Sequence, residues 1–209
     1  MNAAARAALF TLLSLGTLAA DGVHAESNTD NSGSLAAIAR LDFTINIGKF
    51  LYLRVGADGT GVSNVAFALT PSIPPAATSP LTGNNMPVNW NGAAPSFTVA
   101  ATGAVLPVEV RSNAGTVTLR GGVITPLSNG ASTIPMSQIT ITSSEAINLP
   151  APLLPNAGLG TSVNVVGTAF SGLVTSRTAN WTFNFAPPIG SPPAAGNYAG
   201  QVQFTASAP

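Results

Sequence analysis

Hydrophobic and polar residues alternate in several short stretches of this chain. The clearest is residues 41–47 (LDFTINI), in which Leu41, Phe43, Ile45 and Ile47 fall on one face and polar residues on the other. A period of two predicts a β-strand with one face in a core and the other in water. We therefore expect residues 41–47 to form a strand of the folded domain, with Phe43 and Ile45 among its core anchors.

Two further alternating stretches lie near the end of the chain. Residues 180–185 alternate large aromatic with polar side chains, and residues 198–205 resume the alternation after a connector rich in Pro, Gly and Ala. Two such runs across a loop predict paired or neighbouring strands. The core anchors expected here are Trp181, Phe183, Phe185, Tyr198, Val202 and Phe204.

A hairpin is predicted in the middle of the chain. Residues 106–111 and 116–120 both alternate, and Ser-Asn-Ala-Gly at 112–115 separates them as a turn. The register that places the valines and leucines on one face also places Glu109 opposite Arg120. We expect a cross-strand ion pair between these two side chains.

The turn-separated strands define the fold class. No stretch beyond the first 25 residues shows a convincing helical period, and six prolines interrupt residues 71–95, which we expect to be a long loop. This pattern predicts an all-β fold, an antiparallel β-sandwich of the immunoglobulin-like or jelly-roll-like kind. A parallel β-helix is the competing architecture, and it would need an internal repeat at fixed spacing that the sequence does not show.

The beginning of the chain is typical of a secretory signal peptide. Arg6 precedes an apolar run at residues 7–20, and Val23-His24-Ala25 is a small-x-small cleavage site. We therefore expect residues 1–25 to be a signal peptide, 26–35 a flexible N-terminal segment and 36–209 a single β-sandwich domain. The expected location is the periplasm, the cell surface or the extracellular space, with no membrane insertion after cleavage.

Composition narrows the chemistry. The 209 residues carry a net charge of zero and only 7% charged side chains, without the clustered Lys and Arg that nucleic acids require. There is no cysteine, and the single histidine, His24, leaves with the signal peptide. Ser–His and Cys–His catalysis and thiolate metal sites are thereby excluded, and we expect neither a metal nor a cofactor.

Carboxylates are the remaining candidates for catalysis. A pair of them could hydrolyse a glycoside, and the candidates are Asp42, Asp58, Glu109 and Glu145. Asp42 has Arg40 two residues away, and Glu109 has Arg111, so structural ion pairs are the interpretation we favour. We expect the protein not to be an enzyme.

The best candidate for ligand binding is a tryptophan in the proline-rich loop. Trp90 is surrounded by the amides Asn85, Asn89 and Asn91. An aromatic ring can stack on a sugar while neighbouring amides bond its hydroxyl groups. The alternative interpretation is a tryptophan that closes one end of the sandwich, with its N–H bonded to a loop carbonyl.

Four stretches carry a resemblance to known proteins: KFLYLRVG at 49–56, IPMSQI at 134–139, ANWTF at 179–183 and PAAGNYAGQVQFTA at 193–206. Together they resemble small secreted fimbria-like β-sandwich proteins of Gram-negative bacteria. The end of the chain is also similar to the close of WxL-type surface domains, although Trp181-Thr-Phe183 stands where those domains have Trp-x-Leu. The resemblance implies export and a surface or assembly role, and it implies no catalytic residue.

Two functions follow as hypotheses. The first is a non-catalytic exported bacterial surface or fimbria-like protein, structural or adhesive, which assembles through β-sheet edges or loops. The second is a module that binds a glycan or another surface polymer through the Trp90 loop. The expected partners are accordingly other protein subunits, with homo-oligomers left open, or a surface polymer.

Overall fold

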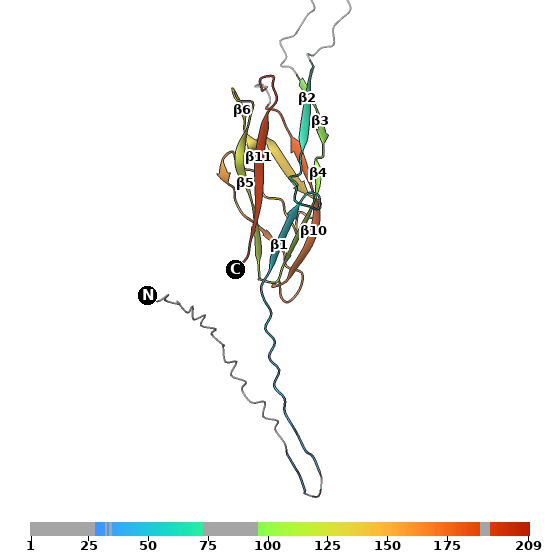
Figure 1. Ribbon diagram of the computed structural model, residues 1–209. Coiled ribbons are helices and arrows are strands. Elements are labelled where there is room, and N and C mark those ends of the chain that lie inside the picture. Colours follow the sequence, from blue (N-terminus) through green and yellow to red (C-terminus); the bar gives the residue numbers. More distant parts are fainter. Residues whose placement is uncertain (1–27, 32, 34, 73–95, 189–192) are drawn as a thin grey trace, which may run out of the picture. The chain divides into compact units, whose positions relative to one another are not determined.

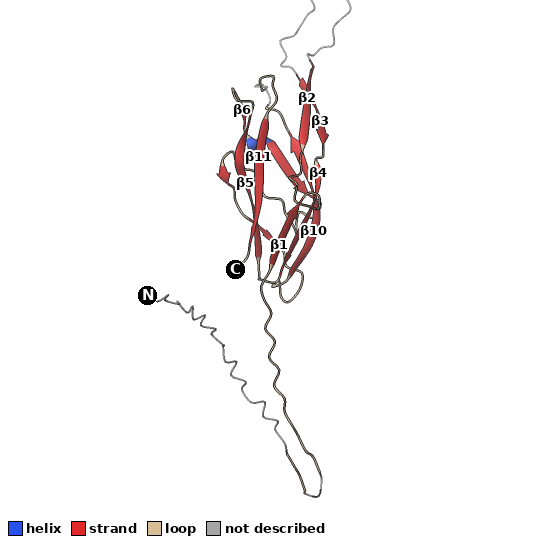
Figure 2. Ribbon diagram, in the orientation of Figure 1, coloured by secondary structure: helices blue, strands red, loops and turns tan. Residues whose placement is uncertain are grey.

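The computed structural model describes residues 28–31, 33, 35–72, 96–188 and 193–209. The chain divides into two units, Met1–Ile47 and Gly48–Pro209. The described part is all-β, with antiparallel strand pairing throughout, as the alternation predicted. Its helical content is one turn of 3-10 helix, η1 (Met136–Gln138), visible in Figure 2 as the short blue segment.

Four strands form the first sheet of the unit Gly48–Pro209. Their order is β1-β4-β10-β7, so β1 and β7 are its edges. The bounds are β1 (Leu51–Val55), β4 (Val105–Ser112), β10 (Thr175–Phe185) and β7 (Ile139–Ser143). Val108, Val110, Trp181 and Phe183 of these strands face inward, whereas Thr178, Asn180, Thr182 and Asn184 occupy the outer face of β10, as is usual for an antiparallel sheet with one face in water.

The second sheet is built on one long strand, β5 (Val117–Ser128). Strand β11 (Ala199–Ser207) pairs along one side of it. Three short strands pair with successive parts of its other side: β9 (Val163–Val165), β8 (Gly158–Leu159) and β6 (Thr133–Ile134). Strands β2 (Ala66–Ser72) and β3 (Ser96–Thr102) form a separate antiparallel pair.

The two main sheets pack against each other as in a β-sandwich. Figure 1 shows β5, β6 and β11 in one layer and β1, β4 and β10 in the other. The buried cluster between them consists of Val108, Val110, Val117, Leu119, Leu149, Val165, Ala179, Trp181 and Phe183. Burial of this apolar surface is the main stabilising term of the fold, because the chain has no disulfide.

The predicted hairpin at residues 106–120 is wrong in its pairing. Strands β4 and β5 are consecutive, but they belong to different sheets, so the turn at 112–115 crosses the sandwich. Val110 and Val117 still share the core, because both strands turn their apolar face to the interior. Glu109 lies on the outer face of the first sheet and pairs with Arg54 and Arg111, so the expected pair with Arg120 does not form.

The two C-terminal stretches also belong to different sheets. Strand β10 carries Trp181 and β11 carries Phe204, and the two rings face each other across the core with centroids 5.1 Å apart in an edge-to-face arrangement. Phe183 also reaches the Phe204 ring, at 6.4 Å. These strands are therefore not a hydrogen-bonded pair; their aromatic side chains join the two layers instead.

The aromatic anchors of these strands are not buried equally. Trp181, Phe183 and Phe185 are buried, and Phe204 is half-buried against the central cluster. Tyr198 and Val202 are half-buried and are not part of the cluster. The Tyr198 hydroxyl donates a hydrogen bond to the carbonyl of Ala194 at 3.0 Å, which ties the ring to the preceding loop.

The clearest alternating stretch of the sequence is not a strand of either sheet. Residues 41–47 pair with no strand, and Phe43 and Ile45 are 83% and 82% exposed. The expectation that these two side chains anchor the core is therefore wrong. The compact unit begins at Gly48, so residues 36–47, which we expected within the sandwich domain, lie outside it.

The remainder of the N-terminal region has little regular structure where it is described. Residues 28–31, 33 and 35 are neither helix nor strand, and the Asp30 carboxylate accepts a hydrogen bond from the Ala36 amide at 3.2 Å. The predicted signal peptide at 1–25 lies outside the described residues. Within the described ranges, no helix is both long enough and apolar enough to cross a membrane.

Candidate functional site

The ligand site expected from the sequence cannot be placed. Asn85, Asn89, Trp90 and Asn91 lie within residues 73–95, outside the described part of the chain. The glycan-binding hypothesis therefore stays a prediction.

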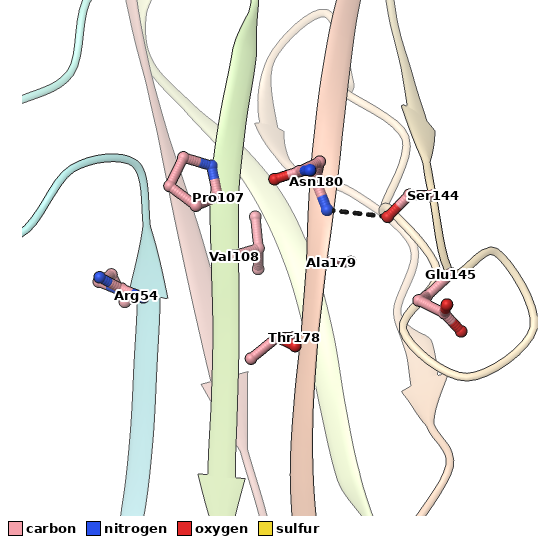
Figure 3. Close-up of a pocket in the computed structure, with 8 residues that line it drawn as sticks. All are labelled: Arg54, Pro107, Val108, Ser144, Glu145, Thr178, Ala179 and Asn180. Atoms are coloured by element: carbon pink, nitrogen blue, oxygen red, sulfur yellow. Dashed lines mark hydrogen bonds between the residues drawn. The ribbon is translucent and has the colours of Figure 1, made fainter.

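A shallow depression lies on the outer face of the first sheet and has a volume of about 260 Å³ (Figure 3). It is lined by residues of β1, β4, β10 and the chain after β7: Arg54, Pro107, Val108, Ser144, Glu145, Thr178, Ala179 and Asn180. Ser144 continues the pairing of β7 with β10. The backbone N–H of Asn180 donates to the Ser144 hydroxyl at 2.9 Å, and the backbone carbonyl of Asn180 accepts the backbone N–H of Ser144 at 2.9 Å.

A charged cluster borders this depression. Glu109 accepts Arg54 Nη2 at 3.0 Å and Arg111 Nη2 at 2.5 Å, and Arg54 also pairs with Asp58. The β1–β4 register places Arg54 directly across from Glu109. The hydrogen bond to Asp58, with the nearby charge of Glu109, raises the pKa of Arg54 above its ordinary value. Arg54 is therefore a permanent cation whose partners belong to its own domain.

The cluster holds strand β1 on the sheet. Substitution Glu109→Gln keeps the side-chain shape but removes the anion from between two guanidinium groups, so we expect a loss of roughly 1–3 kcal/mol in unfolding free energy. Urea titration is the suitable measurement, because it leaves ionic interactions unscreened. The matched control is Glu145→Gln at an exposed carboxylate, with an expected change of about 0.5 kcal/mol or less. Equal effects of the two substitutions would contradict the proposed role of Glu109.

The carboxylates of the compact unit all have partners within it. Asp58 and Glu109 are in the ion pairs above, and Glu145 accepts the side-chain amide of Asn148 at 3.1 Å. The described residues contain no group of three or more His, Asp or Glu side chains that could hold a metal ion. The observed role of these carboxylates is therefore to fasten β1 and the loops after β1 and β7.

The flank of the sandwich next to β7 and β9 is covered by the chain itself. The Leu149 carbonyl accepts the Ser143 hydroxyl at 2.7 Å, and the Asn148 carbonyl accepts the Val166 amide at 2.9 Å. The segment 148–154 thus bridges the edges of both sheets. Leu149 and Leu154 are buried there, and they exclude water from this side of the core.

The opposite flank, next to β1 and β11, has no such cover among the described residues. Strands β1 and β11 approach each other, yet each hydrogen-bonds only within its own sheet. Their inward-facing Leu53, Val55, Phe204 and Ala206 touch the central cluster but remain half-buried, whereas Val108 and Val110 of β4 are fully buried. We call this side, defined by β1, β11 and these four residues, the open flank.

Strand β11 is the longer edge of the open flank. Its nine residues pair with β5 on one side, and the other side pairs with no described strand. An unpaired edge presents backbone N–H and C=O groups that another strand can bind. Sequence reasoning identified β11 as a strand but could not show that it would be an edge, because the order of strands in a sheet is not encoded in alternation.

No family model, curated protein or solved structure matches this chain. Its class is therefore defined by the structure alone, as an all-β protein of antiparallel sheets arranged in a β-sandwich.

Proposed function

We propose that this chain is a non-catalytic, exported structural subunit of a bacterial surface or fimbria-like assembly, joined to its neighbours through β-sheet edges. The observation that carries the proposal is the nine-residue edge of β11, which pairs with no strand among the described residues and lies beside half-buried apolar side chains. Strand addition at such an edge supplies main-chain hydrogen bonds for affinity and covers exposed apolar surface. The predicted signal peptide and the resemblance to secreted sandwich proteins support export, and the sheet arrangement supports an immunoglobulin-like or jelly-roll-like sandwich.

Low charge is consistent with this role. With a net charge of zero, copies of the chain do not repel one another strongly, and such neutrality promotes association. The outer face of β10 carries Thr and Asn at alternate positions, which suits a hydrated surface rather than a catalytic cleft.

The proposal is tested by the association state of the chain from residue 26 onward. We expect size-exclusion chromatography with light scattering to show multimers that grow with concentration, and electron microscopy to show extended particles. A strict monomer at high concentration, together with the absence of polymers on cells, would overturn the proposed function.

Two substitutions on β11 locate the edge that is used. Val202→Lys places a charge on the inward-facing side of the edge strand. Natural sheets use inward-pointing charges of this kind to prevent edge pairing. Gln203→Lys adds the same charge to the opposite, exposed face of the same strand and is the matched control. We expect Val202→Lys to abolish the multimers and Gln203→Lys to retain them, with circular dichroism confirming that both variants fold.

A further inference from the structure

The outer face of the first sheet carries a strip of uncharged polar side chains. Every outward-facing residue of β10 and β7 has a hydroxyl or an amide, and so has the residue after β7. The register places Thr182 beside Thr142 and Asn184 beside Thr140. We call these residues the polar strip: Ser176, Thr178, Asn180, Thr182 and Asn184 of β10, with Thr140, Thr142 and Ser144. The charged cluster of this face lies on β1 and β4 instead.

The depression in Figure 3 is the hollow part of the polar strip. Thr178 and Asn180 line it from β10, and Ser144 lines it from the chain after β7. The hydrogen bonds between Asn180 and Ser144 use the backbone of Asn180, so the side-chain amide remains available to a ligand. Ser144 accepts one of these bonds at its oxygen and keeps its own hydroxyl proton to donate. The depression therefore offers both donors and acceptors to one small molecule.

One apolar ring lies among these polar groups. Pro107 of β4 is exposed and pairs with Asn180 of β10. Proline lacks the N–H that a central strand donates, but Pro107 lies just past the end of β1, whose last residue Val55 pairs with Val108. The sheet therefore tolerates the ring at this point. A sugar matches such a combination, because its hydroxyl groups lie around the ring and its C–H groups form apolar patches on the ring faces.

The charges around the depression indicate which sugars fit. Glu145 lines it, and Asp58 and Glu109 are paired with the lining residue Arg54. These three carboxylates stand against two guanidinium groups, those of Arg54 and Arg111, which leaves one net negative charge. Arg54 already has two of the carboxylates as partners, so it does not attract a further anion strongly. Acidic sugars and phosphate or sulfate groups are therefore disfavoured by like-charge repulsion.

We propose that this depression binds one uncharged sugar residue of a glycan chain. Asn180, Thr178 and Ser144 bond its hydroxyl groups, and Pro107 contacts an apolar face of its ring. The volume of about 260 Å³ lies just below the range of roughly 300–1,000 Å³ for sites of drug-sized ligands, which suits a single sugar residue. The neighbouring sugars extend along the polar strip. None of these residues belongs to the Trp90 loop, and the inference does not depend on the proposed assembly through sheet edges.

Binding of the chain from residue 26 onward to immobilised oligosaccharides tests the ligand class. The array carries uncharged oligosaccharides of glucose, galactose, mannose and N-acetylglucosamine, beside oligosaccharides that contain glucuronic acid or sialic acid. We expect binding to at least one uncharged series and none to the acidic ones. Binding to no uncharged oligosaccharide, or to acidic ones alone, would overturn the inference.

Substitution Asn180→Asp tests the site with little change of shape. It removes the N–H donors of the amide and adds a charge where the field is already negative. Isothermal titration with the bound oligosaccharide should therefore show an affinity lower by about tenfold or more. The matched control is Asn164→Asp at an exposed position of β9 in the second sheet, which should change the affinity by about twofold or less. Equal losses in the two variants would contradict the proposed site.

Substitution Thr178→Val removes one hydroxyl and keeps the β-branched shape. We expect the affinity to fall by about three- to tenfold, the effect of one lost hydrogen bond. Thr205→Val makes the same change at an exposed position of β11 and should leave the affinity unchanged. Circular dichroism checks that all four variants fold, as their exposure leads us to expect.

Substitution Trp90→Ala separates this site from the one predicted from the sequence. We expect Trp90→Ala to bind the oligosaccharide like the unsubstituted chain. Loss of binding in Trp90→Ala with full binding in Asn180→Asp would overturn the inference and favour the Trp90 loop. The measurement does not require multimers, so a strictly monomeric chain that binds the sugar would contradict the proposed function and leave this inference standing.

Discussion

Substitution Trp181→Ala is expected to lower the free energy of unfolding by about 3–5 kcal/mol, the range for truncating a fully buried large aromatic side chain. Trp181 has no exposed surface, and its ring meets the Phe204 ring across the sandwich at 5.1 Å. Its removal would leave a cavity between the sheets at the point where β10 and β11 are joined by side chains alone. Equilibrium unfolding in guanidinium chloride measures the loss, with an unchanged slope showing that the unfolding remains comparable.

Two further variants make this result specific. Phe43→Ala removes an aromatic ring from the exposed segment 41–47, and we expect a change of about 0.5 kcal/mol or less in unfolding free energy. Trp181→Phe keeps a ring in the core and removes the indole N–H, which is buried without an acceptor among the described residues, so it should cost less than Trp181→Ala. A large loss in Phe43→Ala, or none in Trp181→Ala, would contradict the assignment of the core.

Substitution Leu149→Ala is expected to cost about 2–5 kcal/mol, the range for a buried leucine. Leu149 has no exposed surface, and it belongs to the segment 148–154 that covers the flank between β7 and β9. Truncation would leave a void beneath this cover, while the hydrogen bonds of its backbone to Ser143 and Val166 could still form. Chemical denaturation gives the free energy, and the melting temperature should fall in parallel.

The same segment contains its own control. Leu153 is 72% exposed, so Leu153→Ala removes the same side chain in the same loop without opening the core. We expect a change of about 0.5 kcal/mol or less for it. If both leucine variants were equally destabilised, the loss would have to arise from the conformation of the loop, and the covering role of Leu149 would be wrong.

Much of the strand content could be predicted from alternation. Strands β4 and β11 lie within two residues of the alternating stretches 106–111 and 198–205, and β10 contains the stretch 180–185 but begins earlier, at Thr175. The reason is local: a strand with one wet face requires polar and apolar residues in turn, and this requirement does not depend on the partner strand. Residues 121–128 were missed because two glycines and Pro126 obscure the pattern of β5.

Pairing could not be predicted in the same way. The turn at 112–115 was expected to fold β4 back onto β5, but it carries the chain across to the second sheet. Both arrangements place Val110 and Val117 in one core, so alternation does not distinguish them. The ion pairs depend on which strands are neighbours and on their register. Glu109 pairs with Arg54, which is 55 positions earlier in the chain and lies opposite it in β1.

By itself, the sequence determined that the protein is built from β-strands and which residues of most strands lie on a common face. Only the tertiary structure decided which of those faces are covered. Residues 41–47 and residues 180–185 alternate equally well, yet Trp181 is buried and Phe43 is exposed. The physical reason is that burial needs a second surface. That surface comes from residues remote in the sequence, in this case Phe204 for Trp181.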